Sequence, residues 1–120
     1  MNKTVLIVDD NPHILEAIEL ILTNENYTVH SLVKADGIIE KVKKLKPDVI
    51  LLDLLLSGKN GQDITSQLKS LPNTKNIPVI IISAHPSAEK AAKQAGADAF
   101  VAKPFDIEDL LSVIQKYIKT

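Results

Sequence analysis

The chain has 120 residues, a length typical of one globular domain, with 45% hydrophobic and 24% charged residues and a net charge of -1. All fourteen basic residues are Lys, so the chain lacks the basic, Arg-rich face expected of a nucleic-acid binder. It contains no Cys, which excludes disulfides and thiolate metal sites. Its apolar runs are shorter than the ~20 residues of a membrane span, and the run near the N-terminus is shorter than the apolar segment expected of a secretory leader. We therefore expect one cytoplasmic domain over residues 1–120, with no direct binding of nucleic acid or membrane.

Apolar runs typical of strands alternate with helical patterns along the whole chain. Strands are expected at residues 5–8, 27–32, 49–52, 77–82 and 97–102. The runs at 49–52 and 77–82 are aliphatic throughout, which is typical of strands buried on both faces. Polar residues interrupt 27–32, which is therefore expected at a sheet edge. Apolar residues at helical spacing predict helices at residues 12–24, 38–45, 64–71, 88–95 and 107–118.

Two helix starts share a capping residue followed by proline. Asn11-Pro12 precedes the first helix and His85-Pro86 precedes the fourth, and both pairs predict the N-terminal turn. Gly96 is expected to end the fourth helix. The inner face of that helix consists of Ala88, Ala91, Ala92 and Ala95. Such a face buries little apolar area, so it fits either a helix free to shift or one packed very close to its neighbours.

Strands that alternate with helices indicate an α/β fold with a parallel sheet and helices on both faces. In such sheets, ligands bind at the carboxyl ends of the strands. Four of the expected strands end in a polar residue that could serve a site: Asp9 and Asp10 after the first, Asp53 after the third, Ser83 after the fourth, and Lys103 after the fifth.

Three carboxylates at one edge of a sheet repel one another unless a cation lies among them. A Cys-free set of oxygen ligands favours Mg²⁺. Lys103 would add a positive charge for an incoming anion, and Ser83 a hydrogen-bond donor. Together these groups predict a site that receives a phosphoryl group. Asp53 follows the most buried strand and is the predicted acceptor, forming an acyl phosphate.

The same residues, in the same order, resemble the response-regulator receiver domains of two-component signalling, the CheY-like superfamily. The resemblance covers the whole chain and is carried by Asp9-Asp10, Asp53 with Gly61 eight residues later, Ser83-Ala84, Phe100 and Lys103-Pro104. It implies a flavodoxin-like three-layer sandwich, in which five helices enclose a five-stranded parallel sheet of order 2-1-3-4-5.

The resemblance also implies a partner and a metal site. Asp53 would accept a phosphoryl group from a phosphohistidine of a sensor histidine kinase or a histidine phosphotransfer protein. Asp10 and Asp53 would bind Mg²⁺ directly, Asp9 mainly through water, and the backbone carbonyl of Leu55 would complete the protein ligands. The domain would not be a conventional enzyme, because it would catalyse only its own phosphorylation and dephosphorylation.

The resemblance further assigns a switch. Ser83 would hydrogen-bond the phosphoryl group, Lys103 would pair with it, and Phe100 would fill the space that Ser83 leaves. The Lys103-Pro104 bond would be cis. The signal would leave through the fourth helix, fifth strand and fifth helix, towards a downstream effector protein, a fused output domain or a second copy of the domain.

The chain departs from the family near the acceptor. Leu56-Ser57 stands where the family often has Met-Pro, and His85 lies two residues after Ser83. Leu55, two residues after Asp53, cannot orient a hydrolytic water, so we predict slow loss of the phosphoryl group. Timing that loss in Leu55→Asn against the parent chain tests this prediction; the variant should lose phosphate faster, and equal rates would refute it.

Three other functions remain to be weighed. A pseudo-receiver would keep the fold as an interaction module that works without phosphorylation. A flavodoxin-type cofactor binder would need a hydroxyl- and glycine-rich loop where this chain has Asp9 and Asp10, which would repel a flavin phosphate. A phosphatase with an Asp nucleophile would need a second carboxylate at position 55, which is Leu.

Overall fold

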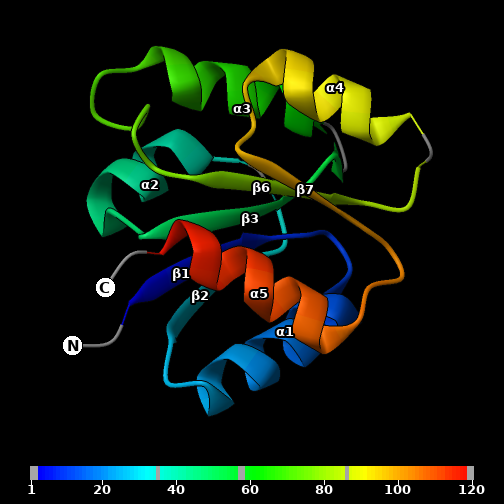
Figure 1. The fold of residues 1–120 in the computed structure, drawn as a ribbon. Helices are drawn as coiled ribbons and strands as arrows, with labels where there is room; N and C mark the ends of the chain where they lie inside the picture. Colours follow the sequence, from blue (N-terminus) through cyan, green and yellow to red (C-terminus); the bar gives the residue numbers. More distant parts are fainter. Residues whose placement is uncertain (1–2, 35, 57–58, 86, 119–120) are drawn as a thin grey trace.

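The computed structural model describes residues 3–34, 36–56, 59–85 and 87–118; at 55, 56 and 59 the description covers the backbone. Its main sheet has five parallel strands in the spatial order β2-β1-β3-β6-β7 (Figure 1). The strands are β1 (Thr4–Val8), β2 (Thr28–Leu32), β3 (Val49–Asp53), β6 (Val79–Ser83) and β7 (Ala99–Ala102). Counted along the chain these strands have the order 2-1-3-4-5, so the predicted flavodoxin-like α/β fold is confirmed.

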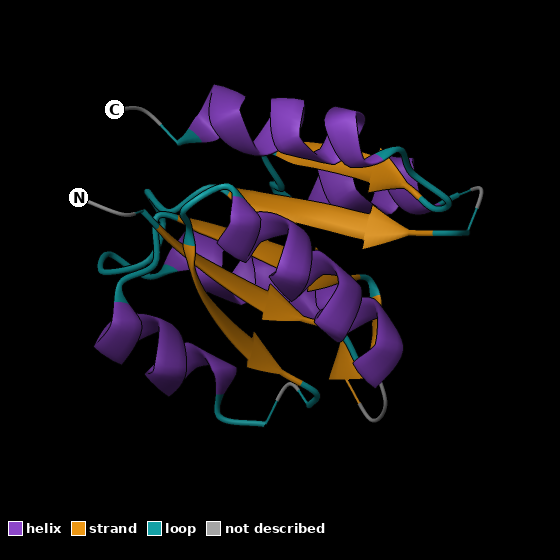
Figure 2. Ribbon diagram, turned by 90° about the horizontal axis from the view of Figure 1, so that it is seen from below, coloured by secondary structure: helices purple, strands orange, loops and turns teal. Residues whose placement is uncertain are grey.

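Among the described residues, five helices cover the two faces of the sheet (Figure 1). One face carries α1 (Pro12–Asn24) and α5 (Ile107–Tyr117), and the other carries α2 (Ile38–Leu45), α3 (Gly61–Ser70) and α4 (Ala88–Ala95). The five strand arrows of the main sheet point the same way, so their carboxyl ends share one edge (Figure 2). Within the described ranges, every helix is too short or too polar to cross a bilayer.

The sheet separates two apolar cores, and its central strands contribute to both. Along β1, Val5 and Ile7 pack in the core under α1 and α5, whereas Leu6 and Val8 pack in the core under α2, α3 and α4. β3 alternates in the same way, because successive side chains of a strand point to opposite faces. This double burial explains why the runs are aliphatic throughout. The edge strand β2 is only half-buried or exposed, as its polar residues predict.

The cap-then-proline prediction is confirmed for α1 and wrong for α4. In α1 the side chain of Asn11 accepts a hydrogen bond from the His13 N–H at 3.0 Å, with Pro12 as the first helical residue. In α4 the N-cap is Ser87 and the first helical residue is Ala88. The predicted proline of that second pair, Pro86, lies outside the described residues.

Two strands begin later than their apolar residues predict. β6 starts at Val79 rather than at Ile77, whose N–H is bonded to the carbonyl of Thr74 in the preceding turn. β7 starts at Ala99 rather than at Ala97, whose N–H is bonded to a carbonyl of α4. The first residue of each apolar run is therefore hydrogen-bonded to the segment before it rather than to a neighbouring strand, and the strand starts two residues later.

The ends of α3 follow from its flanking residues. Asn60 caps the helix, because its side-chain oxygen accepts a hydrogen bond from the Gln62 N–H at 2.8 Å. Leu71 is extended, with ψ of 136°, because a residue before a proline disfavours the helical region, and Pro72 follows it. The helix consequently ends at Ser70, slightly earlier than predicted.

The alanine face of α4 packs closely rather than loosely. Ala88 and Ala92 are each 1% exposed, and α4 lies beside α3 (Figure 1). Of the two alternatives that the sequence left open, close approach is therefore the one that the packing favours. Gly96, in the left-handed region at φ 93°, ends the helix as predicted.

Lys69 joins three segments at the end of the sheet away from the strand carboxyl ends. Its ammonium lies 2.6 Å from a carboxylate oxygen of Asp98 and donates to the carbonyl of Ile77 at 2.9 Å. The same Asp98 oxygen accepts the Val79 N–H at 2.8 Å, and the Tyr117 hydroxyl donates to the Asp98 carbonyl at 2.7 Å. This network ties α3, the start of β6, the α4–β7 turn and α5 together.

Replacing Lys69 by Met should lower the free energy of unfolding by about 1–3 kcal/mol, because it leaves the half-buried Asp98 carboxylate without its charged partner. The matched control is Lys93→Met. Lys93 forms an exposed pair with Glu89 at 4.0 Å, and its loss should change stability by no more than about 0.5 kcal/mol. Urea unfolding measures both values, and equal losses in the two variants would contradict the assignment.

Candidate functional site

The ladders of the main sheet place the predicted site residues at one edge. β1 and β3 pair in register up to Val8 and Leu52, so Asp9 and Asp53 leave the sheet side by side. Ser83, the last residue of β6, is paired with Ala102, the last residue of β7, and Lys103 follows Ala102 directly. A further backbone bond, from the Lys103 N–H to the Ser83 carbonyl at 2.9 Å, continues that ladder.

Asp9 is the most buried acid of this edge, at 3% exposure. One of its carboxylate oxygens accepts the Asn11 N–H at 2.9 Å, and the other accepts a hydrogen bond from the Lys103 ammonium at 3.0 Å. Because a buried charge is costly unless it is paired and hydrogen-bonded, these two contacts account for an ionised Asp9 at this depth.

Lys103 connects two of the strand ends. Its ammonium is 3.0 Å from a carboxylate oxygen of Asp9 and 3.7 Å from one of Asp53, and its side chain is 17% exposed. Lys103 therefore points into the acid cluster rather than into solvent. The Lys103-Pro104 peptide bond is cis, as the resemblance implied.

Three carboxylates converge at this edge of the sheet. One oxygen from each of Asp9, Asp10 and Asp53 lies within 4.8 Å of the other two. Asp10 is exposed, whereas the Asp53 side chain is only 11% exposed. Close carboxylates with hard oxygen donors suit a divalent cation such as Mg²⁺, so the donor set fits that ion. We call Asp9, Asp10, Asp53 and Lys103 the acid–lysine cluster.

Ser83 lies at the same edge and is 3% exposed. Its hydroxyl oxygen accepts the His85 N–H at 3.1 Å, which leaves the hydroxyl proton available to donate to another acceptor. The ring of His85 is held by Ser87, whose N–H donates to Nδ1 at 3.2 Å and whose hydroxyl lies 2.8 Å from that nitrogen. The loop after β6 is thus organised by hydrogen bonds at both of its ends.

A short hairpin follows Asp53 and was not predicted. β4 (Leu55–Leu56) pairs with β5 (Lys59–Asn60) in antiparallel fashion. The Gly61 N–H donates to the carbonyl of Leu54 at 2.7 Å, which closes the hairpin against the end of β3. In the sequence, Asn60 before a helical pattern indicates where the hairpin ends and α3 begins, since Asn favours the N-cap.

Gly61 allows the chain to return very close to Asp53. A Cβ built there would lie 2.6 Å from the Asp53 carbonyl oxygen and 2.8 Å from the Leu54 Cα. Real Cβ atoms do not approach backbone atoms so closely, so a larger residue would push β3 and α3 apart. The glycine that carries part of the resemblance thus supports the backbone of Asp53 itself.

Phe100 lies on β7 and is half-buried, packed against the core under α2, α3 and α4. It borders two small cavities, of about 360 and 230 Å³. Ala84, after Ser83, is exposed. Among the other predicted positions, the side chain of Leu55 and all of Ser57 lie outside the described residues.

The chain belongs to the response regulator receiver domain family, which residues 5–115 match. It is 40% identical over 119 residues to the response regulator ArlR of Staphylococcus epidermidis, and 35% identical over 117 residues to ArlR of Staphylococcus aureus. These matches cover 96% of this chain and 52% of each relative, so the chain spans about half the length of the curated relatives it matches.

Solved structures with the same fold support this assignment. A putative response regulator from Chloroflexus aurantiacus superposes with a TM-score of 0.93 at 29% identity, over 98% of both chains. The receiver domain of the sensor histidine kinase PA1611 from Pseudomonas aeruginosa superposes over 100% of both chains with a TM-score of 0.91 at 25% identity. That structure has a magnesium ion coordinated in its active-site cleft.

Gly61→Ala should destabilise the protein by about 1–3 kcal/mol, because the added methyl group collides with the backbone at Asp53 and Leu54. Ser66→Ala, at an exposed position of the same helix, is the control and should stay within about 0.5 kcal/mol of the parent chain. Urea unfolding compares the two variants. A Gly61→Ala chain as stable as the control would show that the close approach imposes no constraint.

Proposed function

We propose that this domain accepts a phosphoryl group on Asp53 from a phosphohistidine of a sensor kinase or phosphotransfer protein. A carboxylate oxygen of Asp53 attacks phosphorus, the phosphorus–nitrogen bond breaks, and its electron pair returns to the imidazole. The product is an acyl phosphate on Asp53. The observation that carries this proposal is the acid–lysine cluster, in which the Lys103 ammonium lies 3.0 Å from Asp9 and 3.7 Å from Asp53.

The metal ligands in this proposal are Asp10, Asp53 and the backbone carbonyl of Leu55, with Asp9 acting mainly through water. Asp9 suits that indirect role because both of its carboxylate oxygens already accept hydrogen bonds. When bound, Mg²⁺ supplies positive charge that offsets the negative charge of the phosphoryl oxygens. The backbone holds two of the acids in place, because Asp53 is paired with Ile82 and the Asp9 N–H donates to the Leu32 carbonyl at 3.1 Å.

Lys103 and Ser83 supply the other contacts to the phosphoryl group. The ammonium of Lys103 already lies near the Asp53 carboxylate, so it can pair with the oxygens that arrive there. The Ser83 hydroxyl accepts from the His85 N–H, and its own proton is free to be donated to a phosphoryl oxygen. Both groups orient the incoming anion, and the Lys103 ammonium offsets part of its charge.

The response to phosphorylation follows from the added charge, which is about one to two negative units. Ser83 moves towards the new oxygens, and Phe100 takes the volume that Ser83 leaves. The ring of Phe100 is half-buried and borders two surface cavities, of about 360 and 230 Å³, so it is not fully enclosed by packing. The altered face of α4, β7 and α5 then binds an effector protein, an output domain or a second copy of the chain.

A pseudo-receiver that works without phosphorylation is the alternative. The convergence of three carboxylates within 4.8 Å favours the phosphoacceptor, because a module that needs only its surface would gain nothing from this electrostatic cost. We place the domain in the cytoplasm, as is typical of response regulators, and we take residues 1–120 as one receiver unit.

Incubation with a small phosphodonor and Mg²⁺ should add the mass of one phosphoryl group to the parent chain. Asp53→Asn should abolish that gain, and removing Mg²⁺ with a chelator should slow it severely. Asp109→Asn, an exposed acid on α5, is the control and should gain the same mass as the parent. No mass gain in the parent chain would favour the alternative, and full phosphorylation of Asp53→Asn would show that the acceptor is another residue.

A further inference from the structure

Four polar or charged residues are buried in the part of the chain that the structure describes. Two of them, Asp9 and Ser83, belong to the candidate site. The other two are Thr65, in α3, and Thr74, in the turn before β6, which are 0% and 1% exposed. A buried hydroxyl is costly unless it is hydrogen-bonded, and both threonines donate to a backbone carbonyl. Thr65 donates to the carbonyl of Gly61 at 2.8 Å, and this bond leads towards the candidate site.

Gly61 is the residue at which α3 meets the end of β3. Its N–H donates to the Leu54 carbonyl at 2.7 Å, and its Cα lies so close to Asp53 and Leu54 that a side chain would not fit. Leu54 is also held from the side of the sheet, because its own N–H donates to the carbonyl of Ile82 in β6 at 3.2 Å. The bonds from Thr65 to Gly61 and from Gly61 to Leu54 therefore connect the interior of α3 to the residue that follows Asp53.

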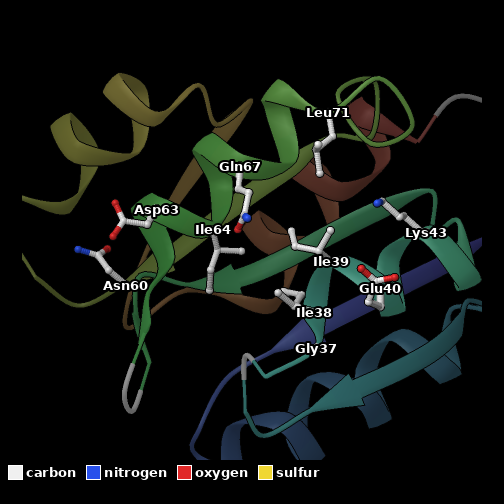
Figure 3. Close-up of a pocket in the computed structure, with 10 residues that line it drawn as sticks. All are labelled: Gly37, Ile38, Ile39, Glu40, Lys43, Asn60, Asp63, Ile64, Gln67 and Leu71. Carbon is white, nitrogen blue, oxygen red and sulfur yellow. The ribbon is translucent and has the colours of Figure 1, made fainter.

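The first turn of α3 is open to solvent on the side of α2. A groove of about 720 Å³ lies between the two helices, and Asn60 and Asp63 line it at the start of α3 (Figure 3). Both of these side chains are exposed. Gly61 itself has no side chain that packing could hold, and glycine has the widest choice of backbone angles. We therefore expect the hydrogen bonds of Gly61 to set the orientation of this turn.

The Thr65 hydroxyl adds a constraint that an apolar side chain of the same shape could not supply. The Gly61 carbonyl lies four residues before Thr65, so it is also the acceptor of the ordinary helical bond from the Thr65 N–H. A second bond, from the hydroxyl of a Ser or Thr to that carbonyl, often bends the helix. Valine would fill the same volume without holding the carbonyl. The hydroxyl therefore limits the backbone angles of the glycine whose N–H holds Leu54.

We propose that Thr65 is a positioning residue for the metal site of the proposed function, on which this inference rests. Its hydroxyl acts through Gly61 and Leu54. The residues on either side of Leu54 are Asp53 and Leu55, whose carboxylate and backbone carbonyl are two of the proposed Mg²⁺ ligands. Thr65 does not contact the ion itself. Groups that orient metal ligands through hydrogen bonds commonly contribute about 10- to 100-fold in metal affinity.

Thr65→Val removes the hydroxyl and keeps the shape of the side chain. It should weaken Mg²⁺ binding about tenfold, measured from the amide signals of the ¹⁵N-labelled chain as Mg²⁺ is added. In the metal-free chain, the Gly61 amide should exchange with deuterium faster than in the parent, because its bond to Leu54 is less firmly held. Thr65→Ser keeps the hydroxyl and loses a buried methyl group, so it should be less stable than the parent and yet bind Mg²⁺ with the affinity of the parent.

Thr74→Val is the matched control, since it removes the other buried threonine hydroxyl, which donates to the Leu68 carbonyl. It should leave both the Kd for Mg²⁺ and the exchange of the Gly61 amide unchanged. The inference is overturned if Thr65→Val binds Mg²⁺ as tightly as the parent, if Thr65→Ser binds no better than Thr65→Val, or if Thr74→Val loses as much affinity. A parent chain that binds no Mg²⁺ would overturn the proposed metal site and this inference together.

Discussion

The contact of the Lys103 ammonium with the carboxylates of Asp9 and Asp53 is the interaction on which the candidate site depends. Three acids at one edge of a sheet raise the energy of the folded state unless positive charge lies among them. Lys103, which follows the edge strand β7, supplies part of that charge. The edge therefore presents three carboxylates that suit a divalent cation, with a lysine ammonium beside two of them.

The parallel sheet makes this arrangement possible. Its ladders bring residues nearly a hundred positions apart in the chain, Asp9 and Lys103, to within 3.0 Å. Aliphatic packing on both faces keeps β1, β3 and β6 fixed in register, while Gly61 lets the chain return against the carbonyl of Asp53. The same packing thus stabilises the core and positions the residues at the edge, whereas the α4–β7–α5 side has small surface cavities beside Phe100.

Sequence patterns predicted the elements buried on both faces and the residues that end their strands, because apolar periodicity and polar strand ends are local signals. They failed where hydrogen bonds between segments decide the outcome. The β4–β5 hairpin depends on the Leu54–Gly61 bond, and the start of α4 depends on Ser87 rather than on His85-Pro86. The Lys69–Asp98 network was equally invisible, since lysines on a solvated face and lysines in a network look alike in a sequence.

The most direct test of the account is the stability of the chain with and without Mg²⁺. If the acid cluster binds the ion, Mg²⁺ at ten times its Kd should raise the free energy of unfolding of the parent chain by about 1.4 kcal/mol. Asp10→Asn and Asp53→Asn should lose most of that increase, and Asp109→Asn should keep it. An increase of the same size in all four proteins, or in none, would contradict the claim that these carboxylates form a cation site.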